Sequence, residues 1–486
     1  MPEGPDKSHY FGGGGVETVL SPIVLIAMLI AMLLILVLPR KYIIVPVLLI
    51  AFLVPLGQSV YALGVHWLVL RIVVLFGLLR VSVINFSSRK SPFAGGFNSI
   101  DKAFLICVVA QAIATPLQYM DSQALVNQFG VLIDFLGGYF LLRALIQDEA
   151  DVYRTLKCLA LLTVVLGLCM IREQLALQNI FGQIGLGRTV PEIREGKIRS
   201  QAVFQHSLTA GTFGAILLPL FFLLWKNGKA KAMAAAGVVG STVMTICSNS
   251  STPLLAYVAG IFAALWWPAR KKMKAVRWGI VLGLLALQMV MKAPFWFIIA
   301  HIDLTGGSSG YHRAELVDQF IMHFRDWWLI GTKDAGTWAY DLWDQQNQYV
   351  GVGEGGGIVA FVFFIAMISR SCAKIGIARK AVEGFKREWF FWFLGAAMFA
   401  NLVAFFGVNY FDQVKLVWFA LLAAISATTA SVLQAQKFQR PPTETELIGA
   451  HCAAAVRGVG CEELVLKTPD TAQPSTSVSR HLIGGC

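Results

Sequence analysis

Three cationic side chains stand close together in one long polar segment of the chain. The run from Arg194 to His206 contains Arg194, Lys197 and Arg199, and an apolar stretch begins just after it at Leu208. A guanidinium group binds phosphate oxygens through paired hydrogen bonds, so these residues predict an anion site for a phosphorylated substrate. Anchoring to the phosphates of membrane lipids is the alternative explanation of the same three cations.

A second long segment carries another candidate arginine. The glycine-rich run that starts at Gly306 precedes Arg313, and the pattern predicts a helix that continues to about Trp328. The apolar stripe of that helix comprises Arg313, Leu316, Val317, Phe320 and Phe324. His312 lies around the other face. A cation at the start of a buried stripe needs either an internal carboxylate or an anionic ligand as its partner.

The same segment ends in a polar run that leads straight into an apolar stretch. The run contains Gln346, Asn347 and Tyr349, and Glu354 follows among glycines at positions 351, 353 and 355–357. Glycine lets a backbone pack closely or admit a ligand. We interpret the four polar residues as candidate site residues, with a simple loop-to-helix transition as the alternative.

Three ionisable residues lie inside apolar stretches, where such residues are functional candidates by default. They are Arg71, Asp134 and Arg143. We predict a structural ion pair between Arg71 and Asp134. Arg143 lies near one end of its stretch, so its side chain is expected to snorkel out of the membrane.

The composition decides which class of protein positions these residues. Of 486 residues, 56% are apolar and only 14% are charged, against about 25% charged in ordinary soluble proteins, which excludes a water-soluble enzyme. The 40 basic minus 28 acidic residues give a net charge of +12, which in a membrane protein marks cytoplasmic loops rather than a nucleic-acid surface. The cysteines show neither a disulfide framework nor paired metal-ligand spacing, so no metal site is expected.

The fold class that follows is an all-α, polytopic integral membrane helix bundle. A span needs roughly 20 apolar residues, and about 12–13 transmembrane helices are predicted on that basis. The candidate spans are Leu20–Leu38, Tyr42–Leu56, Val65–Ile84, Ala103–Met120, Leu125–Leu145, Leu156–Ile171, Leu208–Trp225, Ala232–Cys247, Pro253–Trp267, Trp278–Met291, Gly357–Ser369, Trp389–Val408 and Val414–Leu433.

Basic residues alternate between the connections of these spans. Some connections are rich in lysine and arginine, whereas the short ones between them, such as Asn409–Gln413, contain almost none. By the positive-inside rule the N-terminus lies outside and the C-terminus inside. Two outside segments, 172–207 and 292–356, are too long to be mere connectors, and the second is expected to be a large, partly helical loop.

The predicted domain organisation has three parts. Residues 1–19 form a flexible lead-in, and residues 20–433 form the transmembrane domain. Residues 434–486 form a disordered cytoplasmic tail, since they contain a proline pair, many Ser and Thr residues and little periodicity.

Three places resemble the O-antigen ligase and polysaccharide polymerase superfamily of bacterial envelope glycosyltransferases. Arg199 to His206 is similar to the family's Arg-x-x-Gly-x-Phe-x-His sequence before a span, with Ala202 where glycine is usual. The segment from Ser309 to Leu316 resembles that of the family's loop arginine, at Arg313. Gln346 to Val350 resembles its His-Asn-x-Tyr-Leu motif. The likeness rests on the order and the sidedness of these three short motifs.

The resemblance implies a donor glycan on undecaprenyl diphosphate, presented at the periplasmic face of the bacterial inner membrane. A hydroxyl of a lipid A-core or glycan acceptor then displaces the lipid diphosphate with inversion. Arg199 and Arg313 would stabilise the leaving diphosphate, helped by Arg194 and Lys197, and Asn347 would orient a sugar hydroxyl or the leaving group. No cofactor is implied. The other expected partners are membrane lipid and further polysaccharide-assembly proteins, with no nucleic acid among them.

One departure from the family pattern concerns the base. The family's histidine, thought to activate the acceptor, falls on Gln346, and an amide cannot take a proton at neutral pH. His312, His206 or Glu354 could substitute, or the chemistry could proceed with little base assistance. His206, Tyr349 and Glu354 complete the predicted substrate-binding set.

Three other classes compete with this interpretation. A lipid-linked-oligosaccharide flippase or another transporter would account for Arg71 and Asp134, although no half-to-half repeat is found. A polyprenyl-phosphate glycosyltransferase with an acidic base in its first outside loop is disfavoured, because Gly57–Gly64 contains no acid. A structural subunit of a polysaccharide-export complex would leave Arg199 and Arg313 dispensable.

Overall fold

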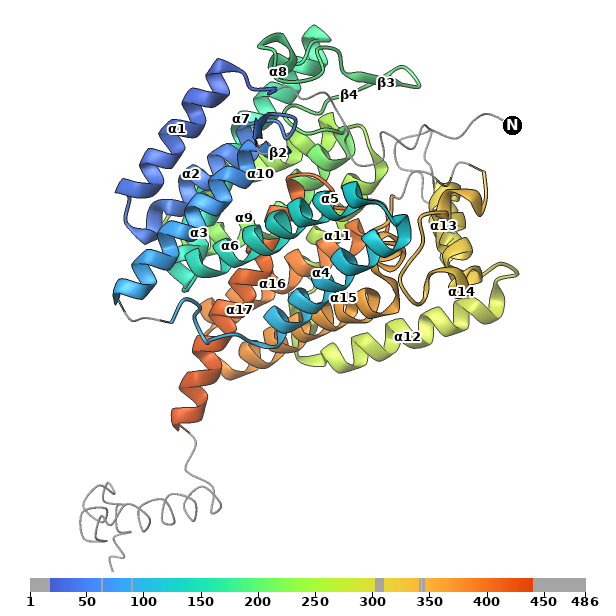
Figure 1. Cartoon of the computed structure of the whole chain (residues 1–486). Helices are drawn as coiled ribbons and strands as arrows, with labels where there is room; N and C mark the ends of the chain where they lie inside the picture. Colours follow the sequence, from blue (N-terminus) through green and yellow to red (C-terminus); the bar gives the residue numbers. More distant parts are fainter. Residues whose placement is uncertain are drawn as a thin grey trace, which may run out of the picture. The chain divides into compact units, whose positions relative to one another are not determined.

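The computed structural model describes residues 18–62, 64–88, 91–301, 310–340, 342 and 346–439 (Figure 1). The chain divides into two compact units, Met1–Gln434 and Ala435–Cys486. The predicted lead-in and tail lie almost wholly outside the described residues, as do the turn at 306–309 and positions 341 and 343–345 of the polar run.

The described chain is almost entirely helical. Its helices are α1 (Pro22–Val37), α2 (Arg40–Leu53), α3 (Val69–Ser88), α4 (Ser99–Tyr119), α5 (Ser122–Leu132), α6 (Gly138–Leu145), α7 (Glu149–Ala176), α8 (Ile180–Gln183), α9 (Ser207–Asn227), α10 (Lys231–Cys247), α11 (Ser251–Leu265), α12 (Met273–Val290), α13 (Gly310–Met322), α14 (Phe324–Trp327), α15 (Gln348–Ala381), α16 (Phe385–Ala404) and α17 (Val414–Gln439). A π-helical turn, Ile133–Gly137, joins α5 to α6. Two antiparallel hairpins pair β1 (Ser59–Ala62) with β2 (Val65–Leu68) and β3 (Glu192–Arg194) with β4 (Lys197–Arg199).

Local sequence explains where several helices begin and end. Asn98 and Asp101 form a capping box at the start of α4, and Asp148 caps α7 by accepting from a backbone N–H group. Such caps satisfy amide groups that have no partner inside the helix. Gly228 follows α9 with a φ of 80°, which a glycine adopts without strain.

Helices stand at all of the predicted spans. Among the described residues, eight helices are long and apolar enough to cross a membrane, which gives the chain the character of a multi-pass membrane protein. The other five predicted spans fall on α1, α2, α10, α11 and α16. The all-helical class is therefore confirmed, and membrane crossing by the five shorter or more polar helices stays a prediction.

Three predicted spans differ from the structure in detail. Residues 65–68 of the span Val65–Ile84 form strand β2, and the helix starts only at Val69. The span Leu125–Leu145 is not one continuous α-helix, because the π-helical turn interrupts it. The span predicted from Gly357 belongs to α15, which already begins at Gln348.

Burial differs sharply between the spans. In α9, 94% of the most apolar stretch is buried, whereas none of the corresponding stretch of α12 is. Glycines allow the close packing of α9 and its neighbours: a Cβ atom at Gly214 would lie 2.7 Å from the carbonyl oxygen of Ser241. Small residues at such crossings let helix backbones approach each other. The side chains of α12 face outward instead, as those of a lipid-facing helix do.

Contacts join the connections between helices in two separate sets. Segments predicted to lie outside bind one another; for example, the Asn249 side chain donates to the carbonyl oxygen of Ile198 at 2.6 Å. Segments predicted to lie inside do the same, as in the ion pair between Arg40 and Asp151 at 3.2 Å. The sidedness of these two sets stays a prediction from the basic residues.

The predicted ion pair between Arg71 and Asp134 is confirmed. The Arg71 Nε and Nη2 atoms each lie 2.9 Å from a different carboxylate oxygen of Asp134, which belongs to the π-helical turn. Gly130 faces the guanidinium group, and a Cβ atom there would lie 2.7 Å from Nη1. Glycine at position 130 therefore makes room for the paired arginine.

The prediction that Arg143 snorkels is wrong. Its side chain is fully buried, with Nε 3.3 Å from Asp101 and Nη2 donating to the carbonyl oxygens of Ala94 and Gly96. A buried guanidinium group requires such partners because it has lost its hydration. The connection that Arg143 was expected to reach folds over it instead.

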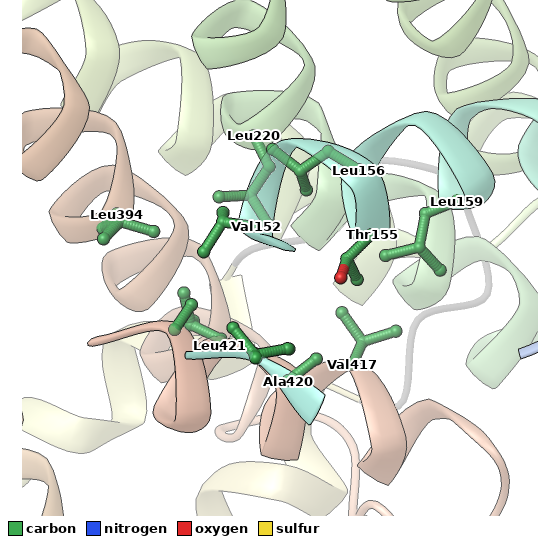
Figure 2. Close-up of a pocket in the computed structure, with 11 residues that line it drawn as sticks. Val152, Thr155, Leu156, Leu159, Leu220, Leu394, Val417, Ala420 and Leu421 are labelled. Carbon is green, nitrogen blue, oxygen red and sulfur yellow. The ribbon is translucent and has the colours of Figure 1, made fainter. Parts of the chain in front are cut away.

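An apolar cavity lies between α7, α9, α16 and α17 (Figure 2). Thr155 is the single polar residue of its lining, and its hydroxyl donates to the carbonyl oxygen of Asp151 at 2.9 Å. The remaining lining residues are Ile146, Val152, Leu156, Leu159, Leu220, Leu394, Val417, Ala420, Leu421 and Ala424. With no ionisable group in its walls, this cavity is a gap in the packing rather than a place for chemistry.

Candidate functional site

One short connection, Phe405–Gln413 between α16 and α17, links two of the three motif segments. The backbone N–H of Gln348 donates to the carbonyl oxygen of Phe405 at 2.9 Å, and the Gln348 side chain accepts from the N–H of Tyr410 at 2.7 Å. Toward the other end of this connection, Asp412 Oδ2 accepts from the N–H of Gln205 at 3.2 Å and from the Thr209 hydroxyl at 2.8 Å. The predicted segments 199–206 and 346–350 therefore flank the same loop.

Four helices of the described chain begin around this connection. They are α9, α11, α15 and α17, and we call their first turns together with Phe405–Gln413 the junction. The hydroxyl of Thr252, in the first turn of α11, donates to the carbonyl oxygen of Gly407 at 3.4 Å, so α11 also contacts this connection. Helix N-termini carry partial positive charge and unsatisfied N–H groups, so they favour anions nearby.

Asp412 is the buried acid of the junction. Burial raises the pKa of its carboxyl group, and the hydrogen bonds from Thr209 and from the backbone N–H of Gln205 oppose that rise. The hydrogen-bond donors stabilise the ionised carboxylate, whereas the loss of hydration destabilises it and so favours the protonated carboxyl group. Asp412 thus anchors the start of α9 through a carboxyl group that is held away from solvent.

A second carboxylate holds the segment Arg199–Ser207 from behind. Glu173, near the end of α7, accepts from the backbone N–H groups of Gln201 at 3.2 Å and Ala202 at 2.9 Å. Ala202 has a φ of 49°, in the left-handed region that favours glycine. The position where the family usually has glycine is therefore one where the backbone needs it, and here alanine accepts the strain.

The three predicted cations Arg194, Lys197 and Arg199 lie on one β-hairpin. Positive φ values at Glu195 and Gly196 form its turn, as in a type I′ hairpin. The register pairs Arg194 with Lys197 and Glu192 with Arg199. Because cross-strand partners and alternate residues share a face, these four side chains project on the same side of the hairpin.

Arg199 is the most buried of these cations and is already engaged. Its Nη1 atom lies 3.0 Å from Glu192 Oε1, and its Nε atom is buried with no hydrogen-bond partner among the described residues. The Glu192 side chain is 40% exposed, so the pair stabilises the fold by only about 0–1 kcal/mol. An incoming anion could displace the carboxylate at small cost.

Arg313 lies on the buried face of α13, as predicted. Leu316 and Phe320 are buried beside it, but Phe324 is exposed because α13 ends at Met322 and α14 starts a new turn at Phe324. The predicted single helix to about Trp328 is therefore wrong at this point. His312, on the other side of α13, is half-buried.

The Arg313 guanidinium reaches the third motif segment. Its Nη2 atom lies 3.5 Å from Oε1 of Gln346, which immediately precedes α15. Gln346 therefore accepts from the arginine at the position where the family pattern has histidine.

Asn347 is committed to the helix that it starts. Its side-chain oxygen accepts from the N–H groups of Tyr349 at 2.9 Å and Val350 at 3.2 Å, and its amide nitrogen lies 3.4 Å from the carbonyl oxygen of Phe406. The residue is completely buried. It orients the first turn of α15 against the junction, and its direct contact with a substrate stays a prediction.

Tyr349 and Glu354 follow Asn347 in the first turns of α15. The half-buried Tyr349 donates its hydroxyl to the carbonyl oxygen of Leu402 at 3.1 Å. The side chain of Glu354 is buried, and its backbone carbonyl accepts from the N–H of Thr332 at 2.8 Å. Both residues thus fasten α15 to its surroundings.

Gly357 breaks α15 after its glycine-rich first turns. Its φ of 65° and ψ of −166° are not helical, and the next N–H group, of Ile358, bonds to the carbonyl oxygen of Trp328 at 2.8 Å. A Cβ atom at position 357 would lie 2.5 Å from the carbonyl oxygen of Leu329. Only glycine allows this break, which redirects the helix next to the segment that follows α14.

The structure joins the candidate residues in two groups. His206, Gln346, Asn347 and Tyr349 lie at the junction, and Arg313 reaches it through Gln346. Arg194, Lys197 and Arg199 belong to the β3–β4 hairpin, which Figure 1 shows apart from α13. Sequence reasoning missed Asp412 and Glu173, since an acid in a five-residue connection or at the end of an apolar run gives no motif.

Comparison with known proteins adds no relative to this description. No protein-family model matches the chain, and no curated protein is significantly similar to it.

Proposed function

We propose that this chain is a membrane glycosyltransferase that moves a glycan from undecaprenyl diphosphate to an acceptor hydroxyl. The observation that carries the proposal is the junction, where Phe405–Gln413 connects the segment 199–206 to the segment 346–350 and Arg313 binds Gln346. The predicted topology assigns this end of the helices to the periplasm, with the N-terminus periplasmic and the C-terminus cytoplasmic.

The chemistry of the leaving group favours this assignment. Displacing a lipid diphosphate concentrates negative charge on phosphate oxygens, and fixed cations aimed at that charge lower the barrier. Arg313 supplies a buried guanidinium beside the N-terminus of α15, so charge and helix dipole act in the same direction. Arg199, on the hairpin that lies apart from α13 (Figure 1), is assigned to a different part of the anionic donor, since its present partner, Glu192, is partly exposed and replaceable. Arg194 and Lys197 extend the cationic face of the hairpin.

Gln346 and Asn347 support the site in the proposed mechanism. Gln346 fixes the Arg313 guanidinium from one side. Asn347 caps α15 by accepting from the N–H groups of Tyr349 and Val350, which fixes the start of this helix beside the junction. The acceptor hydroxyl attacks the anomeric carbon on the face opposite the diphosphate, so the linkage inverts. Ligases and polymerases share this donor chemistry and differ only in whether lipid A-core or another glycan accepts.

The test is transfer in vitro by the purified full chain from an undecaprenyl-diphosphate glycan. We expect Arg199→Ala and Arg313→Ala each to lower transfer about 10²–10³-fold while the proteins remain folded in detergent. Arg188→Ala is the matched control, because Arg188 is an exposed arginine of the same polar segment as Arg199. Unchanged transfer by both folded variants would refute the assignment. Scoring a lipid A-core acceptor and a glycan acceptor separately distinguishes ligase from polymerase.

One observation favours the alternative, a flippase or transporter for lipid-linked oligosaccharides. Transporters commonly place substrate sites at interrupted membrane helices, and α15 is interrupted at Gly357 while the π-helical turn interrupts the path from α5 to α6. A flippase moves a labelled lipid-linked glycan across a vesicle membrane without any acceptor. Acceptor-independent movement, together with no transfer product, would favour this alternative.

A further inference from the structure

His206 occupies an unusual place among the residues of the junction. It is the N-cap residue of α9, yet its side chain makes no capping hydrogen bond, and it is exposed. Its ring stands at 84° to the ring of Phe411, with the centroids 5.5 Å apart. The backbone on either side is fixed, because Asp412 binds the N–H of Gln205 and the hydroxyl of Thr209. An imidazole is therefore held at the surface on a rigid support.

Phe411 is the companion of this imidazole. It is 45% exposed, although the next residue, Asp412, is completely buried. A ring held open beside polar groups can stack on the apolar face of a sugar ring, and such contacts use the large rigid surface of aromatic side chains. His206 and Gln205, both exposed, supply polar groups at the edge of the same surface.

The three candidate bases differ in access. Glu354 is 1% exposed and lies inside α15, so a large acceptor cannot approach its carboxylate. His312 is half-buried on α13 and adjacent in sequence to Arg313, the residue assigned to the leaving diphosphate. His206 is exposed and lies across the connection Phe405–Gln413 from Gln346. An inverting displacement needs its base on the side of the acceptor, away from the leaving group.

We propose that His206 and Phe411 form the acceptor-glycan subsite, with Phe411 stacked on the acceptor sugar and His206 as the base. This inference rests on the proposed transferase function. The O–H bond of the acceptor breaks and its proton passes to an imidazole nitrogen, while the oxygen forms a bond to the anomeric carbon of the donor. The bond from that carbon to the diphosphate oxygen breaks, and its electron pair leaves with the diphosphate.

The charged groups nearest to His206 lie behind it and on the side of the hairpin. Asp412 lies behind it through the contacts with Gln205 and Thr209, and the backbone N–H of Lys415, in the first turn of α17, bonds to the carbonyl oxygen of Asp412. From the hairpin side, Arg199 and Glu192 form an ion pair before the segment that leads to His206.

The experiment measures initial transfer rates against acceptor concentration at saturating undecaprenyl-diphosphate glycan. We expect His206→Gln to lower kcat by about 10²–10³-fold, as for a lost general base, and to remove the fall of activity at low pH. Phe411→Leu should raise the acceptor KM several-fold with little change in kcat. Phe399→Leu is the matched control, because Phe399 on α16 is 39% exposed but lies outside the junction, and it should change neither constant.

The outcomes test separately the base role of His206, the stacking role of Phe411 and the proposed transferase function. Normal kcat and an unchanged pH profile for folded His206→Gln overturn the base, and equal KM values for Phe411→Leu and Phe399→Leu overturn the stacking platform. Should His206→Gln misfold, His206→Asn replaces it, because asparagine is a favoured N-cap residue. If the wild-type chain transfers glycan to no acceptor, the proposed function itself is rejected. If the wild-type chain is active and the variants are as active as it is, only the acceptor subsite is rejected.

Discussion

The contact between Arg313 and Gln346 makes a quantitative test of the proposed site possible. Arg313→Ala removes a buried cation from the place assigned to the leaving diphosphate. Loss of one preorganised group that stabilises transition-state charge costs about 2.7–4 kcal/mol, or about 10²–10³-fold in kcat. Gln346→Ala removes the 3.5 Å hydrogen bond to the arginine, worth about 0.5–1.5 kcal/mol.

The two effects are separable in a double-mutant cycle. If Arg313 acts mainly on the substrate, the coupling energy between positions 313 and 346 cannot exceed the small contribution of their hydrogen bond. We therefore expect Gln346→Ala to slow transfer only about 2–10-fold. In the Arg313→Ala background the same change should have almost no further effect.

The assay is transfer by the four purified proteins at saturating donor and acceptor, with unfolding temperatures measured in the same detergent. A coupling energy as large as the whole effect of Arg313→Ala would contradict the reasoning, since Arg313 would then serve only to hold Gln346. A matching loss of unfolding temperature would assign the effect of Arg313→Ala to folding instead.

Three further predictions concern the support of the site. A Cβ atom in the left-handed region costs about 1–2 kcal/mol, so Ala202→Gly should leave the unfolding temperature unchanged or raised, whereas the β-branched Ala202→Val should lower it; equal effects would contradict this. Burial raises the folded-state pKa of Asp412, so its contribution to stability is complete below about pH 3.9 and is lost as pH rises toward the folded pKa. The Asp412→Asn variant should show less of this decline in unfolding temperature, and an equal or steeper decline would refute the linkage. Arg71→Met should destabilise the protein, by at most about 3–5 kcal/mol, because it removes the hydrogen-bonded partner of Asp134 and leaves only Lys415 as a nearby cation, and adding Asp134→Leu should recover part of that loss; a double variant no more stable than Arg71→Met would argue against the pair.

The length of the apolar stretches predicts the helices, and the basic residues predict the sidedness of the connections. Both signals are local, since each can be read from one segment of the chain at a time. A helix stands at each predicted span, although residues 65–68 of one span form strand β2, and the sidedness of the connections stays a prediction. The Arg71–Asp134 pair is predictable for a related reason: a buried charge must be neutralised, and few partners exist at that depth.

What the sequence does not predict depends on contacts between distant segments. Nothing local marks Asp412 as the acceptor for the N–H of Gln205, because the two residues are 207 positions apart. The break at Gly357 depends on the carbonyl of Trp328 as an alternative acceptor. The burial of Arg143 is not predictable from the sequence for the same reason, since only the tertiary fold brings Asp101 and two carbonyl oxygens to its guanidinium group. Boundaries and partners of this kind are properties of the packing.

The glutamine at position 346, where the resembled motif has histidine, has a role in the proposed mechanism. The side-chain oxygen of Gln346 accepts from the Arg313 guanidinium, and an amide oxygen accepts such a bond at every pH at which the protein is folded. A histidine in the same contact would have to accept with a ring nitrogen, and that nitrogen could not also take the proton of an acceptor. A chain that uses position 346 to hold its arginine therefore needs its base elsewhere. The exposed imidazole of His206, across the connection from Gln346, lies where an acceptor can reach it.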